Sequence, residues 1–217
     1  MPNEMNHSSA IVKEGIPLII PPGAAAIIAF LAGFFWVAGL LFLLTLFVVW
    51  FFRNPERTTP QNPLQFTAPA DGKVIRIEEV SSGGGSDRSY LKISIFMNVF
   101  NVHVNRIPCY GRIVSILYSP GKFLSANLDK ASALNEKNAV VIRRDDGREI
   151  MVVQIAGLIA RRIVCWMKEG MEVKKGERFG LIRFGSRVEV FLPLGSTPLV
   201  KIGDKVRAGE TPIGELI

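Results

Sequence analysis

Two histidines limit the imidazole chemistry available to this chain. His7 belongs to a polar N-terminal stretch, so acid–base catalysis by histidine depends on His103. The segment 98–108 alternates like a strand edge, which turns His103 to the same side as Asn101 and Asn105. An imidazole with an ordinary pKa of about 6.5 exchanges protons at neutral pH. His103 is therefore either a general acid and base or a structural histidine.

Two further positions combine a reactive side chain with a turn before a predicted strand. Asp71 precedes Gly72, and Ser186 follows Gly185 just before the strand 188–192. A serine hydroxyl is a weak nucleophile until a base activates it. Asp-Gly is also a common turn signal, and the Gly-Ser pair lacks the Gly-x-Ser-x-Gly pattern of a hydrolase nucleophile. Neither pair is specific by itself.

The cysteines give no sign of metal chemistry. Cys109 and Cys165 lack the spacing of metal ligands. In a reducing compartment they are small apolar residues rather than a disulfide. We therefore expect no metal site.

The elements that must position these residues are mostly strands. Short β-branched runs alternate with turn residues, and Asp145-Asp146-Gly147 is typical of a hairpin. Helical periodicity is nearly absent after residue 54, apart from a turn or two within 123–137. The predicted strands cover residues 73–77, 91–96, 139–142, 151–155 and 188–192. We expect a mostly β domain over residues 54–217.

An internal repeat refines the expected architecture. The stretch 172–180 resembles 200–210, since each carries a valine, a few residues, and then glycine followed by an acid. This pattern is similar to the turns of biotinyl and lipoyl carrier folds, in which two strand–turn units form a flattened sandwich. The resemblance implies a barrel-sandwich domain. No lysine lies in the Met-Lys-Met context of the carriers.

The N-terminal part is apolar over the thickness of a bilayer. From Ala24 to Phe52 there are 29 residues without a charge, and one helix of this length exceeds a hydrocarbon core of roughly 30 Å. One tilted helix fits, as do two short helices broken near Gly33 or Gly39. We expect a tail over 1–16 and a retained membrane anchor over 17–53, because the basic start and cleavage site of a signal peptide are missing. A buried core helix is the alternative.

The charge distribution favours a membrane surface. The net charge is +7, and only Glu4, Lys13 and Glu14 are charged before residue 53, so the excess belongs to the rest of the chain. A basic domain beside a bilayer suits anionic lipid head groups. No patch of interleaved aromatic and basic residues indicates nucleic acid. Arg53 and Arg57 follow the apolar run, which by the positive-inside rule predicts a cytoplasmic C-terminal domain.

A series of short motifs is more specific than any one of them. In chain order the motifs are FRNPER (52–57), PADG (69–72), FNVHVNRIP (100–108), PGKF (120–123), NEKN (135–138), QIAG (154–157) and FGSRVEV (184–190). This series closely resembles the short-chain prokaryotic phosphatidylserine decarboxylases. The resemblance runs from about residue 52 to residue 192, and the apolar anchor before it also fits.

The resemblance implies a proenzyme that cuts itself. In the family the serine hydroxyl, here Ser186, attacks the carbonyl of Gly185, and the serine becomes a covalent pyruvoyl group. Residues 1–185 would form the β subunit and 186–217 the α subunit of a heterodimer. The pyruvoyl ketone then forms a Schiff base with phosphatidylserine, which loses CO2 and yields phosphatidylethanolamine. Asp71 and His103 match the family's base and orienting acid, and His103 is also a candidate proton donor.

Arg106 departs from the family pattern. Longer members carry two histidines three residues apart in this segment, and the second position here is Arg106. Either His103 serves both maturation and decarboxylation, or one role passes to Asp71, water or Arg106. Arg106 is also a candidate ligand of the lipid phosphate, by charge and position. Glu136 matches the family without an assigned role.

Alternatives remain for the cut, the substrate and the function. Gly195-Ser196-Thr197 resembles a cleavage sequence of some relatives, but it follows the strand 188–192, whereas their cleaved pair precedes that strand. We therefore expect the cut at Ser186. An ether lipid such as archaetidylserine is an alternative substrate, and a membrane-anchored adaptor without activity is an alternative function. The anchor and the arginines after it predict a cell-membrane location with the catalytic domain in the cytoplasm, and homo-oligomers remain open.

Overall fold

The chain folds into two compact units. A computed structural model describes residues 9–81, 89–126, 130–158, 162–183 and 185–216. The units are Met1–Glu56, which is helical, and Arg57–Ile217, which is mostly β. Residues 1–8 of the predicted tail lie outside the described residues.

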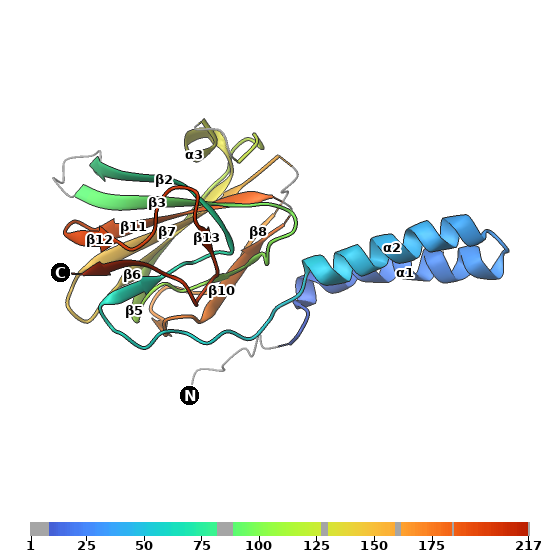
Figure 1. The fold of residues 1–217 in the computed structure, drawn as a ribbon, viewed down its shortest axis with the longest axis horizontal. Helices are drawn as coiled ribbons and strands as arrows, with labels where there is room; N and C mark the ends of the chain where they lie inside the picture. Colours follow the sequence, from blue (N-terminus) through green and yellow to red (C-terminus); the bar gives the residue numbers. More distant parts are fainter. Residues whose placement is uncertain (1–8, 82–88, 127–129, 159–161, 184, 217) are drawn as a thin grey trace. The chain divides into compact units, whose positions relative to one another are not determined.

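The N-terminal unit is a pair of apolar helices. A short 3-10 turn, η1 (Lys13–Gly15), leads into α1 (Ile16–Leu31), and α2 (Phe35–Phe51) returns alongside it (Figure 1). Gly33 lies between the helices with a φ of 81°, a conformation that favours glycine. The apolar segment is thus broken at Gly33, whereas Gly39 lies inside α2. The stretch Lys13–Leu31 is long and apolar enough to cross a bilayer, and α2 is a shorter apolar helix.

The C-terminal unit confirms the expected fold class, mostly β with a curled sheet (Figure 1). Eight strands form one antiparallel sheet in the order β13-β2-β3-β11-β7-β6-β5-β9. Two three-stranded sheets, β1-β14-β12 and β4-β10-β8, complete the fold. The strands are β1 (Gln65–Thr67), β2 (Gly72–Ser81), β3 (Ser89–Met97), β4 (Val104–Arg106), β5 (Gly111–Ser119), β6 (Lys137–Arg143), β7 (Glu149–Ala156), β8 (Ile163–Cys165), β9 (Glu172–Val173), β10 (Arg178–Ile182), β11 (Ser186–Pro193), β12 (Ser196–Pro198), β13 (Lys205–Val206) and β14 (Pro212–Leu216).

The strands predicted from β-branched runs all belong to the large sheet, as parts of β2, β3, β6, β7 and β11. The predicted hairpin turn joins β6 to β7, where the N–H of Arg144 donates to the carbonyl of Arg148 at 2.9 Å. A short helix, α3 (Lys130–Leu134), lies within the region where a turn or two was expected.

The middle of the large sheet is held by a buried strand. Val188, Val190 and Leu192 alternate along β11 and are fully buried in the main core. Burial of each such side chain contributes about 1.5–3 kcal/mol. Because β11 pairs with β3 on one side and β7 on the other, its first residue, Ser186, lies between two neighbouring strands.

The sequence repeat corresponds to two equivalent turns. Each turn contains a glycine with positive φ, Gly176 at 82° and Gly209 at 73°. Before the first turn, β9 pairs with the start of β5 at Gly111, and before the second, β13 pairs with the start of β2 at Gly72. β2 and β5 each shift register at the same distance from that glycine. The two halves are therefore built alike, as the resemblance to carrier folds implied.

The two halves cross at a pair of prolines. The N–H of Thr67 donates to the carbonyl of Pro108 at 3.0 Å, and the N–H of Arg106 donates to that of Pro69 at 2.9 Å. This reciprocal pattern relates the halves by an approximate twofold. Asp71 is the residue before the strand-starting glycine of its half, and a tyrosine takes that place in the other half. The carboxylate thus belongs to one half alone.

Candidate active site

Ser186 is a buried residue at the end of the sheet where β3 and β7 terminate. It begins β11 and pairs with Met97 on β3 and with Ala156 on β7. Its side chain is not exposed, and its hydroxyl donates to the Sδ of Met97 at 3.3 Å. Gly185, just before it, has a φ of 66° and turns the chain sharply into the strand.

His103 lies beside the peptide that precedes Ser186. It is buried, and its Nδ1 is 2.9 Å from the carbonyl oxygen of Asn101. Because a carbonyl only accepts, this contact places the ring proton on Nδ1 and makes Nε2 a hydrogen-bond acceptor. The N–H of Gly185 donates to that Nε2 at 3.4 Å. The structure thus brings His103 and the Gly185-Ser186 pair together, with the basic nitrogen facing the chain next to the serine.

A chain of buried amides leads from the core to the serine. Asn138 donates to the Oε1 of Gln154 at 3.0 Å, and Gln154 donates to the Oδ1 of Asn105 at 2.8 Å. Asn105 in turn donates to the Sδ of Met97 at 3.7 Å. These side chains come from four strands, and all are buried. The network fixes the position of the thioether that accepts the Ser186 hydroxyl bond.

The carbonyl of Gly185 packs against the backbone of Gly157. A Cβ at position 157 would overlap the carbonyl oxygen of Gly185 and would lie 3.3 Å from the Cβ of Ala126. The preceding residue, Ala156, is held from the other side, where its N–H donates to Glu136 and its carbonyl accepts from the amide of Asn135 at 2.7 Å. The end of β7 is therefore a fixed backbone surface for this carbonyl.

Asp71 belongs to a charge cluster at the start of β2. Its Oδ2 accepts from Arg57 at 2.9 Å, and its Oδ1 accepts from the N–H of Ala208 at 2.8 Å. Arg57 also pairs with Glu210 at 2.9 Å. Since β2 pairs with β3, this cluster lies one strand beyond the Met97 that contacts Ser186. Asp71 is thus near the serine end of the sheet, with its hydrogen bonds directed to Arg57 and Ala208.

Arg106 is buried where the two repeat turns meet. Its guanidinium donates to the carbonyl of Gly176 at 2.8 Å, and its Cδ lies close to Gly209. Only 5 % of the residue is exposed. Its contacts therefore connect the two halves of the domain.

Glu136 lies beneath the end of β7. It is buried, and its carbonyl accepts the N–H of Ala156 at 3.0 Å. Partial desolvation, the Glu136 charge and a hydrogen bond from the Tyr118 hydroxyl to the Glu136 carboxylate together raise the pKa of Tyr118. Glu136 thus supports the strand that contacts Gly185.

Ser196 has a different environment from Ser186. It begins β12 after the turn at Gly195, and its hydroxyl donates to the carbonyl of Pro193 at 2.7 Å. The imidazole contact is made at Gly185 instead.

The thiols are protonated at neutral pH. Burial raises the pKa of Cys109 to about 12, and burial also raises the pKa of Cys165. Within the described part of the chain, no three His, Cys, Asp or Glu side chains gather as metal ligands do.

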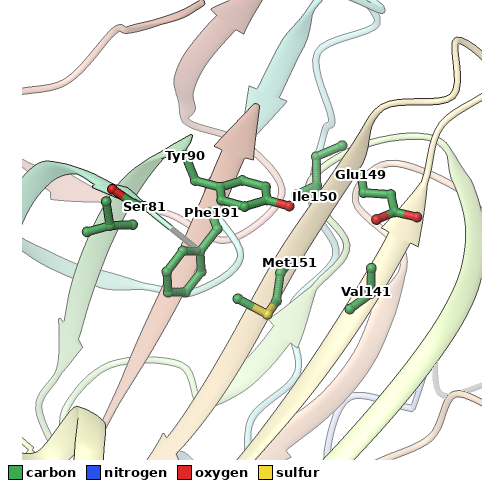
Figure 2. A pocket seen from close by; sticks show the side chains of 8 residues that line it. Ser81, Tyr90, Val141, Glu149, Ile150, Met151 and Phe191 are labelled. Atoms are coloured by element: carbon green, nitrogen blue, oxygen red, sulfur yellow. The ribbon is translucent and has the colours of Figure 1, made fainter. Parts of the chain in front are cut away.

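The cavity in Figure 2 is separate from these residues. It has a volume of about 200 Å³ and is lined by Tyr90, Met151 and Phe191, among others. Tyr90 pairs with Pro193, at the opposite end of β11 from Ser186. None of the predicted site residues lines this cavity.

Four contributors to the site had no role assigned from the sequence. Met97 lay just after the predicted strand 91–96 with nothing to mark it, whereas Asn105, Gln154 and Gly157 belonged to motifs of the family series. Membership of those motifs was the signal that could have singled them out.

Comparisons with known proteins agree with the motif series. The family model for phosphatidylserine decarboxylase matches residues 44–214. The chain is 57 % identical over 211 residues to a phosphatidylserine decarboxylase proenzyme of Syntrophus aciditrophicus, covering 97 % of this chain and 99 % of that protein. Proteins of the same name from Ralstonia nicotianae and Cupriavidus taiwanensis are 50 % and 47 % identical, and the alignments cover 95 % and 98 % of this chain and 95 % and 99 % of theirs. The chain belongs to the phosphatidylserine decarboxylase family.

Proposed function

We propose that this protein cuts itself between Gly185 and Ser186 and then decarboxylates phosphatidylserine to phosphatidylethanolamine and CO2. The observation that carries the proposal is the hydrogen bond from the N–H of Gly185 to the Nε2 of His103, next to a buried serine. The similar proteins are named proenzymes, which agrees with a chain that matures by cleavage.

The cleavage needs a nucleophile, a base and a fixed carbonyl. The Ser186 hydroxyl attacks the carbonyl carbon of Gly185 while His103 takes the hydroxyl proton. The Gly185–Ser186 amide bond breaks as an ester bond to the Ser186 oxygen forms, and the amine takes up a proton. Loss of the α-proton then expels the Gly185 carboxylate and leaves dehydroalanine, whose hydrolysis gives the pyruvoyl group and ammonia. Gly157 and Met97 hold the two reacting groups.

The environment of Ser186 fits a small ketone. Its neighbours are the Met97 thioether and the backbone of β3 and β7, which accommodate a methyl group as readily as a hydroxyl. The pyruvoyl group supplies the electron sink for loss of CO2. His103 is the residue beside it that delivers a proton to the substrate carbon.

Asp71 and Arg106 receive different roles. We assign Asp71 to the acid–base set with His103. Asp71 lies at the start of β2, and β2 pairs with β3, the strand that ends at Met97. A role for Arg106 at the lipid phosphate stays a prediction, since its described hydrogen bond is to a backbone carbonyl. Arg106→Lys keeps the charge, and an unchanged KM for phosphatidylserine in that variant would count against phosphate binding.

The two fragments stay together as a heterodimer of residues 1–185 and 186–217. The smaller fragment contains β11 to β14. Since β11 pairs with β3 and β7, and β14 pairs with β1, cleavage leaves these ladders intact. This arrangement keeps the new N-terminus inside the sheet.

The protein acts at the cell membrane. The apolar helices α1 and α2 provide the anchor, and Arg53 and Arg57 after them favour a cytoplasmic catalytic domain. The net charge of +7 suits an anionic lipid surface.

Decarboxylation of defined lipids tests the proposed reaction. Wild-type protein and Ser186→Ala are incubated with vesicles containing phosphatidylserine or its ether-linked archaeal analogue. We expect CO2 release from phosphatidylserine by the wild type alone. Faster CO2 release from the ether lipid would show that the ether lipid is the preferred substrate. A single uncut band with no CO2 from either lipid would favour the alternative function, an adaptor without activity.

A further inference from the structure

An exposed aromatic side chain lies at the tip of the turn after β3. Phe100 is 62 % exposed. The turn is closed by two asparagines, since the N–H of Asn98 donates to the Oδ1 of Asn101 at 2.9 Å and the N–H of Phe100 donates to the Oδ1 of Asn98 at 2.9 Å. The carbonyl of Asn101 in the same turn holds the Nδ1 of His103. One closed turn therefore presents Phe100 to solvent and orients the imidazole.

An exposed leucine lies on the other side of the cut. Leu158 is 65 % exposed and follows the end of β7. Ser186 pairs with Met97 at the end of β3 and with Ala156 at the end of β7. Phe100 and Leu158 thus extend beyond the two strands that enclose Ser186.

Two arginines outside the core lie close to the cut. Arg183 is half-buried and precedes Gly185 by two residues. Arg162 is exposed, and its carbonyl accepts the N–H of Arg183 at 3.3 Å. Arg183 directly follows β10, and Arg162 directly precedes its neighbour β8.

We propose that Phe100 and Leu158 insert into the surface of a bilayer containing anionic phosphatidylserine. This inference rests on the lipid substrate proposed above. Aromatic and aliphatic side chains at a basic surface bind the boundary between head groups and acyl chains. Arg162 and Arg183 complement the anionic lipid. The surface then brings the serine head group to Ser186 while the acyl chains stay in the membrane.

Paired substrates test this docking surface. Phe100→Ser and Leu158→Ser are compared with the wild type for self-cleavage, and for decarboxylation of phosphatidylserine in vesicles and of a monomeric short-chain phosphatidylserine. The matched control is Leu194→Ser, because Leu194 is 60 % exposed just beyond the other end of β11. Phe100→Leu is a second variant that keeps an apolar side chain in the turn.

We expect complete cleavage and a fall of about tenfold in the vesicle-to-monomer activity ratio for both serine variants. Phe100→Leu and Leu194→Ser should keep a ratio near that of the wild type. An unchanged ratio in the serine variants, or an equal loss on both substrates, would overturn the proposal. A changed oligomeric state with an unchanged ratio would make this surface a contact between copies instead. Failure of the wild type to decarboxylate either lipid would contradict the proposed function itself.

Discussion

The carbonyl oxygen of Gly185 lies against the backbone of Gly157, in the space that a Cβ at position 157 would occupy. This relationship joins the bond proposed to break with the end of a neighbouring strand. The carbonyl must stay in place while the Ser186 hydroxyl attacks it, and a misplaced reacting group lowers the rate steeply.

We expect Gly157→Ala to slow self-cleavage by about 100-fold, because the added Cβ displaces the carbonyl from its position. Precursor and fragments are quantified over time on gels. Gly111→Ala is the matched control, since its Cβ would likewise overlap a backbone carbonyl, that of Arg143. Gly111 begins β5 at the end of the sheet away from the cut, whereas Ser119 ends that strand on the side of the cut. The control should lose stability but still cleave. Cleavage of Gly157→Ala at the wild-type rate would remove Gly157 from this role.

His103→Ala should leave the chain uncut, with cleavage slowed by about 100-fold or more through loss of the base. His7→Ala provides the control, because it removes the other histidine from the polar tail. Added imidazole should restore part of the cleavage in His103→Ala and have no effect on His7→Ala. Full cleavage with full activity in His103→Ala would exclude His103 from the mechanism.

Asp71→Asn should destabilise the domain more than Glu210→Gln does. Both carboxylates pair with Arg57, but the side chain of Asp71 is 11 % exposed and that of Glu210 is 28 % exposed. Loss of one partner of a buried pair costs about 3 kcal/mol, whereas a more exposed pair contributes about 1 kcal/mol or less. Urea unfolding in a Ser186→Ala background measures both without interference from cleavage. Cleavage rates are then measured for both variants in the protein that retains Ser186. Only Asp71→Asn should also slow cleavage, which separates a role in maturation from a role in stability.

Gln154→Leu should break the buried amide chain. It leaves the Oδ1 of Asn105 and an amide hydrogen of Asn138 without their partner, at a cost of about 1–3 kcal/mol for each group. The exposed Gln61→Leu is the control and should cost less than about 1 kcal/mol. Unfolding midpoints of the two variants provide the comparison. Equal midpoints would show that the network adds little to the stability of the core.

The sequence was sufficient to predict the strands with strong β-branched runs and the site residues that lie inside family motifs. It did not predict the nine-residue strand β5. It also missed three-residue strands such as β1 and β8, because so few residues become a strand only through distant partners. The contacts of the site show the same limit. Ser186 meets Met97 across 89 positions, and Gly185 meets His103 across 82. Periodicity shows which faces are buried, but it does not show which strands become neighbours.

The mass of the C-terminal fragment tests the central claim most directly. Cleavage at Gly185–Ser186 predicts a fragment of 32 residues, 186–217, lighter by one ammonia than the same fragment beginning with serine. Its ketone should react with a hydrazine, and Edman sequencing should find it blocked. An intact chain of 217 residues, or a fragment of 22 residues beginning at Ser196, would contradict the account.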